Sequence, residues 1–263
     1  MKNRFAAVII ILSVVLCSLL SGCAGKSEAS GEVIGIIGAM DVEVDSLKEA
    51  AKATKTSEIT GMEFCSGTIG DKKVVIVKCG MGKVNAGVCA NTLINEFGCT
   101  KVINTGVAGS LDNRINIGDI VVSTDAVQHD FDVSYLGYKK GEIPYTELYA
   151  FTADEELVNA AVSAAKTCAT GKTVFEGRVC SGDQFISTKE QKDRIADNFG
   201  GLCCEMEGGA IAQICHLNGV PFGIIRAISD KVDETEYVDY TVFEAEAAKN
   251  CAKIVKQMVE DME

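Results

Sequence analysis

The sequence predicts one α/β domain with a mostly parallel β-sheet and helices on both of its faces. Short β-branched runs alternate along the chain with longer segments whose apolar residues recur at helical spacing. Several of the short runs are apolar at every position, as expected of strands buried on both faces. The length of 263 residues, 47% of them apolar, suits one large domain better than two comparable ones.

The strands and helices follow from these patterns in order. Strands are expected at Val33–Ile37, Val74–Val77, Lys101–Asn104, Ile120–Ser123, Thr173–Cys180 and Phe222–Ile225. A helix is expected over Gly82–Phe97, and a second one at the C-terminus, where Phe243, Ala247 and Cys251 share one face. Ligands of such sheets bind beyond the carboxyl ends of the strands, so the residues that follow each strand are candidates for a functional site.

The N-terminus has the features of an export leader. Lys2 and Arg4 precede an apolar run from Phe5 to Leu20, which is shorter than a membrane-spanning helix. The run ends in Leu20-Ser21-Gly22-Cys23, and this segment resembles the cleavage site of bacterial lipoproteins, in which the cysteine becomes the acylated N-terminus. An uncleaved signal anchor is the alternative.

The leader defines the expected organisation of the chain. Residues 1–22 are expected to be a signal peptide, residues 23–31 a flexible tether, and residues 32–263 the folded domain. Lipid on Cys23 would then hold the exported domain at the outer face of a bacterial membrane.

The composition argues against several partners and cofactors. The net charge of −12 repels nucleic acid. Only two histidines, His129 and His216, are present, and neither has metal-ligand spacing, so we expect no metal site and no serine–histidine triad. The chain has 12 cysteines without a C-x-x-C motif, and many lie in apolar runs, where buried free thiols are expected.

Two glycine-containing segments follow expected strands. Gly35–Glu43 runs from a strand through a turn into an acidic helix start, where Asp41 and Glu43 would ordinarily complement the helix dipole. Asn104–Ser110 continues a strand end with small residues, which allow a flat ligand to approach the backbone closely. Each segment alone is a weak signal.

Three further segments contain aromatic or acidic residues. Ser181–Ile186 places Phe185 just after a strand, where its ring can stack on a base or fill the core. Cys204–Ala210 holds two glutamates on either side of a methionine, and unpaired carboxylates are costly in a core. Arg226–Asp230 ends a buried strand in an aspartate that could equally cap the next helix.

Together and in this order, the five segments resemble the 5′-methylthioadenosine/S-adenosylhomocysteine nucleosidases over nearly all of residues 32–260. This family belongs to the nucleoside phosphorylase group. The resemblance implies a single domain with a central twisted mixed β-sheet flanked by helices. It also implies hydrolysis of the N-glycosidic bond of an adenine thionucleoside, with 5′-deoxyadenosine as a further candidate substrate. No cofactor is implied, and a homodimer is expected, with the segment Val133–Tyr138 closing the partner's pocket.

The resemblance assigns the chemistry to two carboxyl groups. Glu43 matches the base that activates the attacking water, and Asp230 matches the acid that protonates adenine N7, with Ser229 as its support. Protonation of N7 lets the adenine leave nearly neutral, and nearby carboxylates stabilise the positive charge that develops on the ribose. A base on the opposite face of the sugar deprotonates water, as in inverting glycosidases.

The resemblance also implies residues that bind the substrate. Phe185 would stack on adenine, the backbone of Ile186 would read the edge of the base, and Met206 and Glu207 would contact the ribose. The other implied substrate contacts are Met40, Met81, Ala108, Gly109, Glu205, Arg226 and Tyr240. Val107 departs from the pattern, because some members carry a serine there near the water, and positioning of the water would then depend on Glu43 and Arg226.

Two alternatives remain open. Another nucleoside-cleaving enzyme of the same fold, a phosphorylase or a futalosine-type hydrolase, would share these motifs. A phosphorylase needs cationic groups for phosphate, yet Asp41-Val42-Glu43 is acidic where a phosphate-binding arginine is expected. A lipoprotein that only binds nucleosides would not need both Glu43 and Asp230.

Overall fold

The computed structural model describes residues 31–146, 148–231 and 240–262, without the side chains of residues 240–242. A compact unit spans Glu32–Glu263. The expected signal peptide, all but the last residue of the expected tether, the expected lipidated Cys23 and the side chain of Tyr240 lie outside the described residues. Within the described part, no helix is both long and apolar enough to span a membrane.

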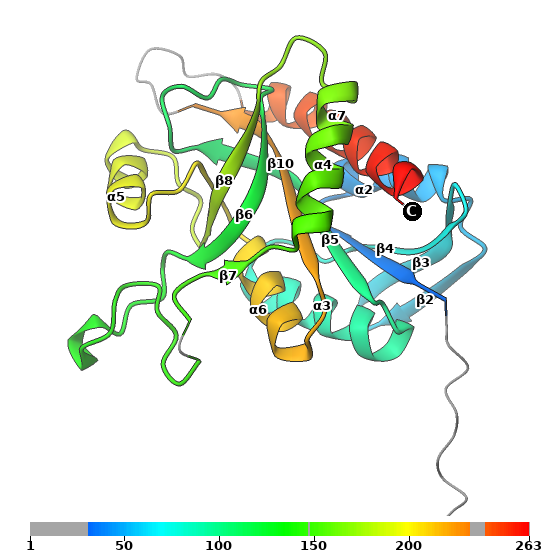
Figure 1. The fold of residues 1–263 in the computed structure, drawn as a ribbon, viewed down its shortest axis with the longest axis horizontal. Coiled ribbons are helices and arrows are strands. Elements are labelled where there is room, and N and C mark those ends of the chain that lie inside the picture. Colours follow the sequence, from blue (N-terminus) through cyan, green and yellow to red (C-terminus); the bar gives the residue numbers. More distant parts are fainter. Residues whose placement is uncertain (1–30, 147, 232–239, 263) are drawn as a thin grey trace, which may run out of the picture. The chain divides into compact units, whose positions relative to one another are not determined.

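The described elements alternate between strands and helices over most of the chain (Figure 1). In order they are β1 (Val33–Gly38), α2 (Asp41–Ala50), β2 (Lys55–Ile59), β3 (Met62–Ile69), β4 (Lys72–Lys78), α3 (Lys83–Phe97), β5 (Lys101–Ser110), β6 (Ile120–Gln128), the 3₁₀ helix η1 (Ser134–Leu136), β7 (Phe151–Thr152), α4 (Glu155–Cys168), β8 (Val174–Ser181), α5 (Lys189–Phe199), β9 (Cys203–Glu205), α6 (Gly208–Asn218), β10 (Phe222–Asp230) and α7 (Tyr240–Asp261).

The described strands form one mixed sheet in the order β10-β6-β8-β9-β5-β1-β4-β3-β2, with β7 beside β6. Parallel pairs join β4, β1, β5 and β10 in succession, and they also join β6, β8 and β9. Strand β10 pairs with both β5 and β6, so β5, β10, β6, β8 and β9 close into a ring. The mixed sheet flanked by helices agrees with the fold implied by the family resemblance.

Several strands are longer than the sequence predicts, among them β6, which extends to Gln128 instead of Ser123, and the two strands β5 and β10 that lead to the site. Asn104–Ser110, expected to be a turn, continues β5, because its backbone pairs with β10 on one side and, at its end, with β9 on the other. Arg226–Asp230 likewise belongs to β10. All six expected strands and both expected helices are present, whereas β2, β3, β7 and β9 have no counterpart among the expected elements.

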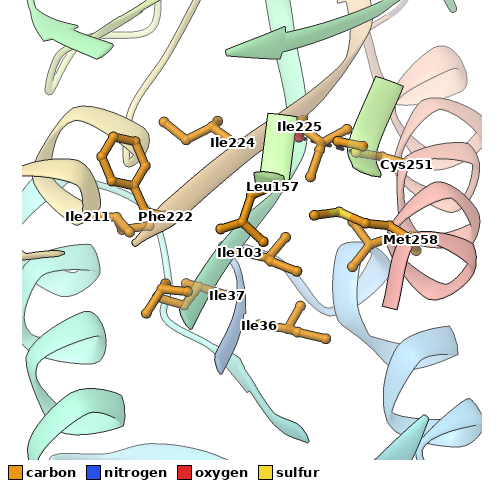
Figure 2. Packing of buried hydrophobic residues seen from close by; sticks show 14 of the residues in the cluster. Ile36, Ile37, Ile103, Leu157, Ile211, Phe222, Ile224, Ile225, Cys251 and Met258 are labelled. Carbon is orange, nitrogen blue, oxygen red and sulfur yellow. Dashed lines mark hydrogen bonds between the residues drawn. The ribbon is translucent and has the colours of Figure 1, made fainter. Parts of the chain in front are cut away.

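The core lies on both faces of the sheet. Helices α2, α4 and α7 pack together on one side, and α3 and α6 pack together on the other (Figure 1). Figure 2 shows that Ile36 and Ile225 point toward the first group, while Ile37 and Ile224 point toward the second. This burial on both faces explains why the expected strands are apolar without alternation.

The cysteines form part of this core. The ten described cysteines are free thiols, and all except Cys168 are buried. Burial raises the pKa of Cys99 and Cys215 to about 12 each, so these thiols stay protonated and unreactive at neutral pH. The structure agrees with the expectation of buried thiols that act as small apolar side chains.

Candidate active site

A pocket opens beyond the ends of β1, β5, β8, β9 and β10. Every expected site residue lines it except Arg226, which lies behind the pocket wall, and Tyr240, whose side chain is outside the described residues. Gln184, Cys204 and Ala39 also line the pocket and were not singled out from the sequence. Within the described residues, no group of histidine, cysteine and acidic side chains is arranged to hold a metal.

Glu43 is a buried carboxylate held by backbone N–H groups. Its Oε2 accepts hydrogen bonds from the backbone of Ala39 at 2.6 Å and of Met40 at 3.0 Å, and its Oε1 accepts one from Val107 at 3.1 Å. Burial raises its pKa, although Arg226 and the three N–H donors oppose the shift. Since a carboxylate has about four acceptor positions, one remains for a ligand or water.

Gly106 allows Glu43 and Arg226 to approach each other. A Cβ at this position of β5 would overlap with the guanidinium of Arg226 and with Oε1 of Glu43. Glu43 and Arg226 were expected to position the water together, and they can lie this close only because residue 106 is a glycine. Val107, the residue that departs from the family pattern, supplies its backbone N–H to Glu43 and also lines the pocket.

Arg226 and Glu205 form a buried ion pair beside the pocket. The Nη2 atom of Arg226 donates to Glu205 and to the side chain of Asn104. Glu205 also accepts hydrogen bonds from Ser181 Oγ and from the backbone of Glu207 and Gly208. Three of these four hydrogen bonds go to Oε2 and one goes to Oε1, so Oε1 keeps an acceptor position for the expected contact with the substrate, and Glu205 lines the pocket.

Glu207 has a different environment from Glu205. Its Oε1 accepts a hydrogen bond from the backbone of Gly82 at 2.8 Å, and its Oε2 lies 4.0 Å from Arg226. Gly82 has a φ of 96°, a conformation that favours glycine and that lets its N–H point at the carboxylate. Burial, reinforced by the negative charge of Glu205, raises the pKa of Glu207 to about 7.

Asp230 ends β10 and lines the same pocket as the glutamates. Its Oδ1 accepts a hydrogen bond from Ser229 Oγ at 3.1 Å, and Gly109 leaves room for the carboxylate against β5. Its Oδ2 lies 2.6 Å from the ammonium group of Lys192 on α5. The sequence analysis missed Lys192, because it lies in a run of polar residues that is typical of an exposed helix surface.

The mouth of the pocket is apolar. The side chains of Met81 and Phe185 are 64% and 59% exposed, and they line the pocket together with Met40, Ile186 and Met206. A flat aromatic ligand can stack on the face of Phe185, while apolar substituents would contact the methionines. The pocket thus combines an apolar mouth with carboxylates at its inner surface.

Comparisons with known proteins agree with this site. Residues 33–260 match the family model of the phosphorylase superfamily. A 5′-methylthioadenosine/S-adenosylhomocysteine nucleosidase of Halalkalibacterium halodurans is 41% identical over 227 residues, which cover 86% of this chain and 97% of that protein.

Solved structures also resemble the chain. The nucleosidase of the same name from Neisseria meningitidis, solved with methylthio-immucillin-A, has a TM-score of 0.83 and 37% identity and covers 88% of this chain and 100% of its own. A futalosine hydrolase of Helicobacter pylori has a TM-score of 0.82 and 32% identity, and the match covers 88% of this chain and 98% of that protein. The chain belongs to the phosphorylase superfamily and, within it, to the 5′-methylthioadenosine/S-adenosylhomocysteine nucleosidase family.

Proposed function

We propose that the protein hydrolyses the N-glycosidic bond of 5′-methylthioadenosine and S-adenosylhomocysteine, and releases adenine and the thioribose. The observation that carries this proposal is the placement of Glu43 and Asp230 in one pocket, where each carboxyl group is oriented by its own set of partners. The family membership supports the same reaction.

Asp230 acts at the base end of the substrate. Adenine stacks on Phe185, and Asp230 transfers a proton to N7, so that the base departs as a neutral molecule. Ser229 holds one oxygen of the carboxyl group by its 3.1 Å hydrogen bond. Fixing this geometry before the substrate binds lowers the entropic cost of proton transfer.

Glu43 and Glu207 act at the sugar end. As the glycosidic bond breaks, C1′ gains positive charge, which these carboxylates stabilise electrostatically. Glu43 then accepts a proton from the attacking water. The raised pKa of Glu43 makes it a better proton acceptor than an exposed glutamate would be.

The lining of the pocket favours water over phosphate as the nucleophile. Among the described lining residues no lysine or arginine is present, whereas Glu43, Glu205 and Glu207 all carry carboxylates. A phosphate dianion would face these negative charges without a cation to hold it. We therefore propose a hydrolase rather than a phosphorylase. Futalosine hydrolysis is the alternative reaction, and the substrate tests below distinguish it from hydrolysis of the thionucleosides.

We also propose that the domain forms a homodimer through the outer face of α3. Val84 and Val88 recur at helical spacing on α3 and are 78% and 39% exposed, and Met81, just before the helix, is 64% exposed. Tyr135 and Leu136 of η1, within the expected partner-contacting segment, are exposed as well. Large exposed apolar patches on soluble proteins commonly mark interfaces, and this one adjoins the pocket through Met81.

A lipid anchor at the outer face of a bacterial membrane is the proposed location of the protein. The support comes from the sequence, in which a basic and then apolar segment precedes Leu20-Ser21-Gly22-Cys23. The family match begins at residue 33, so this N-terminal segment lies outside the part of the chain that matches the family model.

The catalytic roles predict the effect of two substitutions. Asp230→Asn cannot deliver the N7 proton and Glu43→Gln cannot accept the proton of water, so each should lower kcat by ~10²–10⁴-fold with little change in ligand affinity. Asp41→Asn is the matched control, because Asp41 is an exposed residue that pairs with Lys78.

Adenine release is followed with methylthioadenosine, S-adenosylhomocysteine, 5′-deoxyadenosine and futalosine, with and without phosphate. Hydrolysis gives the free sugar in both conditions, and a sugar phosphate would contradict the proposal. Near-normal turnover of both variants would contradict the assigned roles. Binding of nucleosides without any base release would instead indicate a binding lipoprotein.

The raised pKa of Glu207 predicts a pH-dependent stability. Between about pH 4.5 and 7 the folded protein retains a proton on Glu207 that the unfolded chain releases, so the free energy of unfolding should fall as the pH rises. Glu207→Gln should reduce this fall by on the order of 3 kcal/mol. Urea unfolding across this range measures it, with exposed Glu58→Gln as the control, and equal slopes in wild type and Glu207→Gln would contradict the prediction.

The proposed anchor predicts that Cys23→Ala leaves the chain unprocessed and without lipid, whereas Cys17→Ala in the apolar run is processed normally. Intact-mass analysis of the protein extracted from membranes distinguishes these products. An intact N-terminal methionine and an unmodified Cys23 in the unmutated protein would show that the anchor is absent.

The proposed dimer predicts that Val84→Asp converts residues 32–263 into monomers, because it buries an unpaired charge in the interface. Ser163→Asp adds the same charge on the exposed face of α4 and should leave the dimer intact. Analytical ultracentrifugation measures both. A wild-type protein that sediments as a monomer at micromolar concentration would refute the dimer.

A further inference from the structure

Three charged residues outside the pocket lining, Lys83, Asp130 and Asp183, form a closed set of contacts, here named the polar triangle. Lys83 begins α3, Asp130 follows β6 and Asp183 follows β8. Lys83 Nζ donates to Asp130 Oδ1 at 2.5 Å, and the backbone N–H of Asp183 donates to Asp130 Oδ2 at 2.8 Å. The backbone N–H of Lys83 donates to Asp183 Oδ1 at 2.7 Å. Each member is bonded to the other two, so the triangle joins three separate segments of the chain.

The local sequence does not explain the charge at the start of α3. A cation there faces the positive end of the helix dipole, and the first turn has no acidic residue of its own. The side chains of Lys83 and Asp130 are only 17% and 16% exposed, so each charge needs the other. Although burial opposes the shift, the hydrogen bonds from Lys83 and Asp183 hold the pKa of Asp130 below its ordinary value. The position of Lys83 is therefore explained by its pairing with Asp130.

The triangle fixes the turn that precedes α3. Gly80 and Gly82 in this turn have φ values of 82° and 96°, and glycine backbone loses more conformational freedom on ordering than that of other residues. A Cβ on Gly82 would lie 3.1 Å from Asp183 Oδ1, so the turn and the triangle are in close contact. Among the described residues, the N–H of Gly82 is the one hydrogen-bond donor to the carboxylate of Glu207. The orientation of Glu207 therefore depends on the triangle.

Glu207 is more sensitive to a displaced donor than the other two glutamates of the pocket. Glu43 accepts three backbone hydrogen bonds, and Glu205 accepts four hydrogen bonds in total. The Oε2 atom of Glu207 lies 4.0 Å from Arg226, which is beyond hydrogen-bond distance. Loss of the contact with Gly82 would thus leave no hydrogen-bond donor among the described residues to orient Glu207.

We propose that Asp130 positions Glu207 for the sugar hydroxyls of the substrate, and so acts in ribose binding without touching the ligand. The connection runs through Lys83 and the N–H of Gly82. This inference rests on the proposed function. With one oxygen of Glu207 held by Gly82, its remaining acceptor positions are directed at the ligand. Hydrogen bonds are directional, so a small rotation of the carboxylate weakens those from the hydroxyls while the stacking of the base is kept.

The test measures how strongly the full-length protein, in detergent, depends on the ribose hydroxyls. The measured quantity is kcat/KM for 5′-methylthioadenosine divided by kcat/KM for its 2′,3′-dideoxy analogue, and it is named the hydroxyl ratio. Both substrates are cleaved by the same active molecules, so the fraction of protein that is folded cancels from this ratio. A purely structural loss therefore lowers both values of kcat/KM and leaves the hydroxyl ratio unchanged.

Asp130→Asn keeps the shape of the side chain, but its NH₂ group must face one of two donors, Lys83 Nζ or the N–H of Asp183. The hydroxyl ratio should fall by about 10–100-fold, because hydrogen bonds to a charged group contribute factors of this size. Lys83→Met should lower it in the same direction. Asp125→Asn is the matched control, because Asp125 lies on β6, its side chain is 24% exposed and both of its oxygens accept from Arg178. This control should leave the hydroxyl ratio unchanged.

An exposed position decides the question if the buried variants fold poorly. Asp183→Ala removes the acceptor of the Lys83 N–H and should lower the hydroxyl ratio, whereas Asp183→Asn keeps an acceptor oxygen and should restore most of it. In a Glu207→Ala background, Asp130→Asn should have no further effect on the hydroxyl ratio, because the group through which it acts is absent. Thermal unfolding reports the stability of each variant separately.

Three outcomes would overturn the inference. An equal loss for both substrates in Asp130→Asn would indicate a purely structural role for the triangle. A further fall of the hydroxyl ratio in the Glu207→Ala background would show that Asp130 acts through another group. A fall in Asp125→Asn as large as that in Asp130→Asn would show that the effect is not specific to the triangle.

Failure of the proposed function gives a different result. If the wild-type protein releases no adenine from either substrate, hydrolysis itself is refuted. The corresponding ratio of the two dissociation constants, measured by calorimetry on the same variants, then decides whether Asp130 positions Glu207 for the sugar hydroxyls. An unchanged ratio of dissociation constants in Asp130→Asn would overturn the inference in that case.

Discussion

The site depends on the buried guanidinium of Arg226. It lies between Glu205, Glu207 and Glu43, three carboxylates that could not be buried together without a positive charge among them. Removal of one partner from a buried ion pair typically costs ~3–5 kcal/mol, because the remaining charge has no counterpart. The position of Arg226 also affects α6, because its partner Glu205 accepts hydrogen bonds from the backbone of Glu207 and Gly208 and thereby fixes the start of this helix. Arg226 is thus needed for the pocket to form, although it does not line it.

The two ends of the pocket hold their carboxyl groups by different means. Glu43 is held by three backbone N–H groups and a nearby guanidinium, none of which can give up a proton at neutral pH. Asp230 is held by two side chains, the hydroxyl group of Ser229 and the ammonium group of Lys192.

The sheet topology brings these groups together. β10 pairs with β5 in parallel, so the ends of both strands meet at one place, and β1 adds the turn that leads to Glu43. β10 also pairs with β6, and β6 pairs with β8. These pairings place the end of β8, and the segment with Phe185 that follows it, beside the ends of β1, β5 and β10. Small residues at Gly106 and Gly109 then let Arg226 and Asp230 approach the backbone of β5.

The sequence by itself determined the fold class, the principal strands and helices, and most of the residues that line the pocket. Periodicity and strand-end motifs are local signals, and Glu43, Glu207, Phe185 and Asp230 each lie directly beside one. Tertiary structure alone decided the strand character of Asn104–Ser110, which depends on pairing with β10 and β9 from distant parts of the chain. It also decided the roles of Glu205 and Lys192. Their charged partners, Arg226 and Asp230, lie 21 and 38 residues away in sequence, and no local pattern distinguishes a lysine that packs inward from α5 from one that faces solvent.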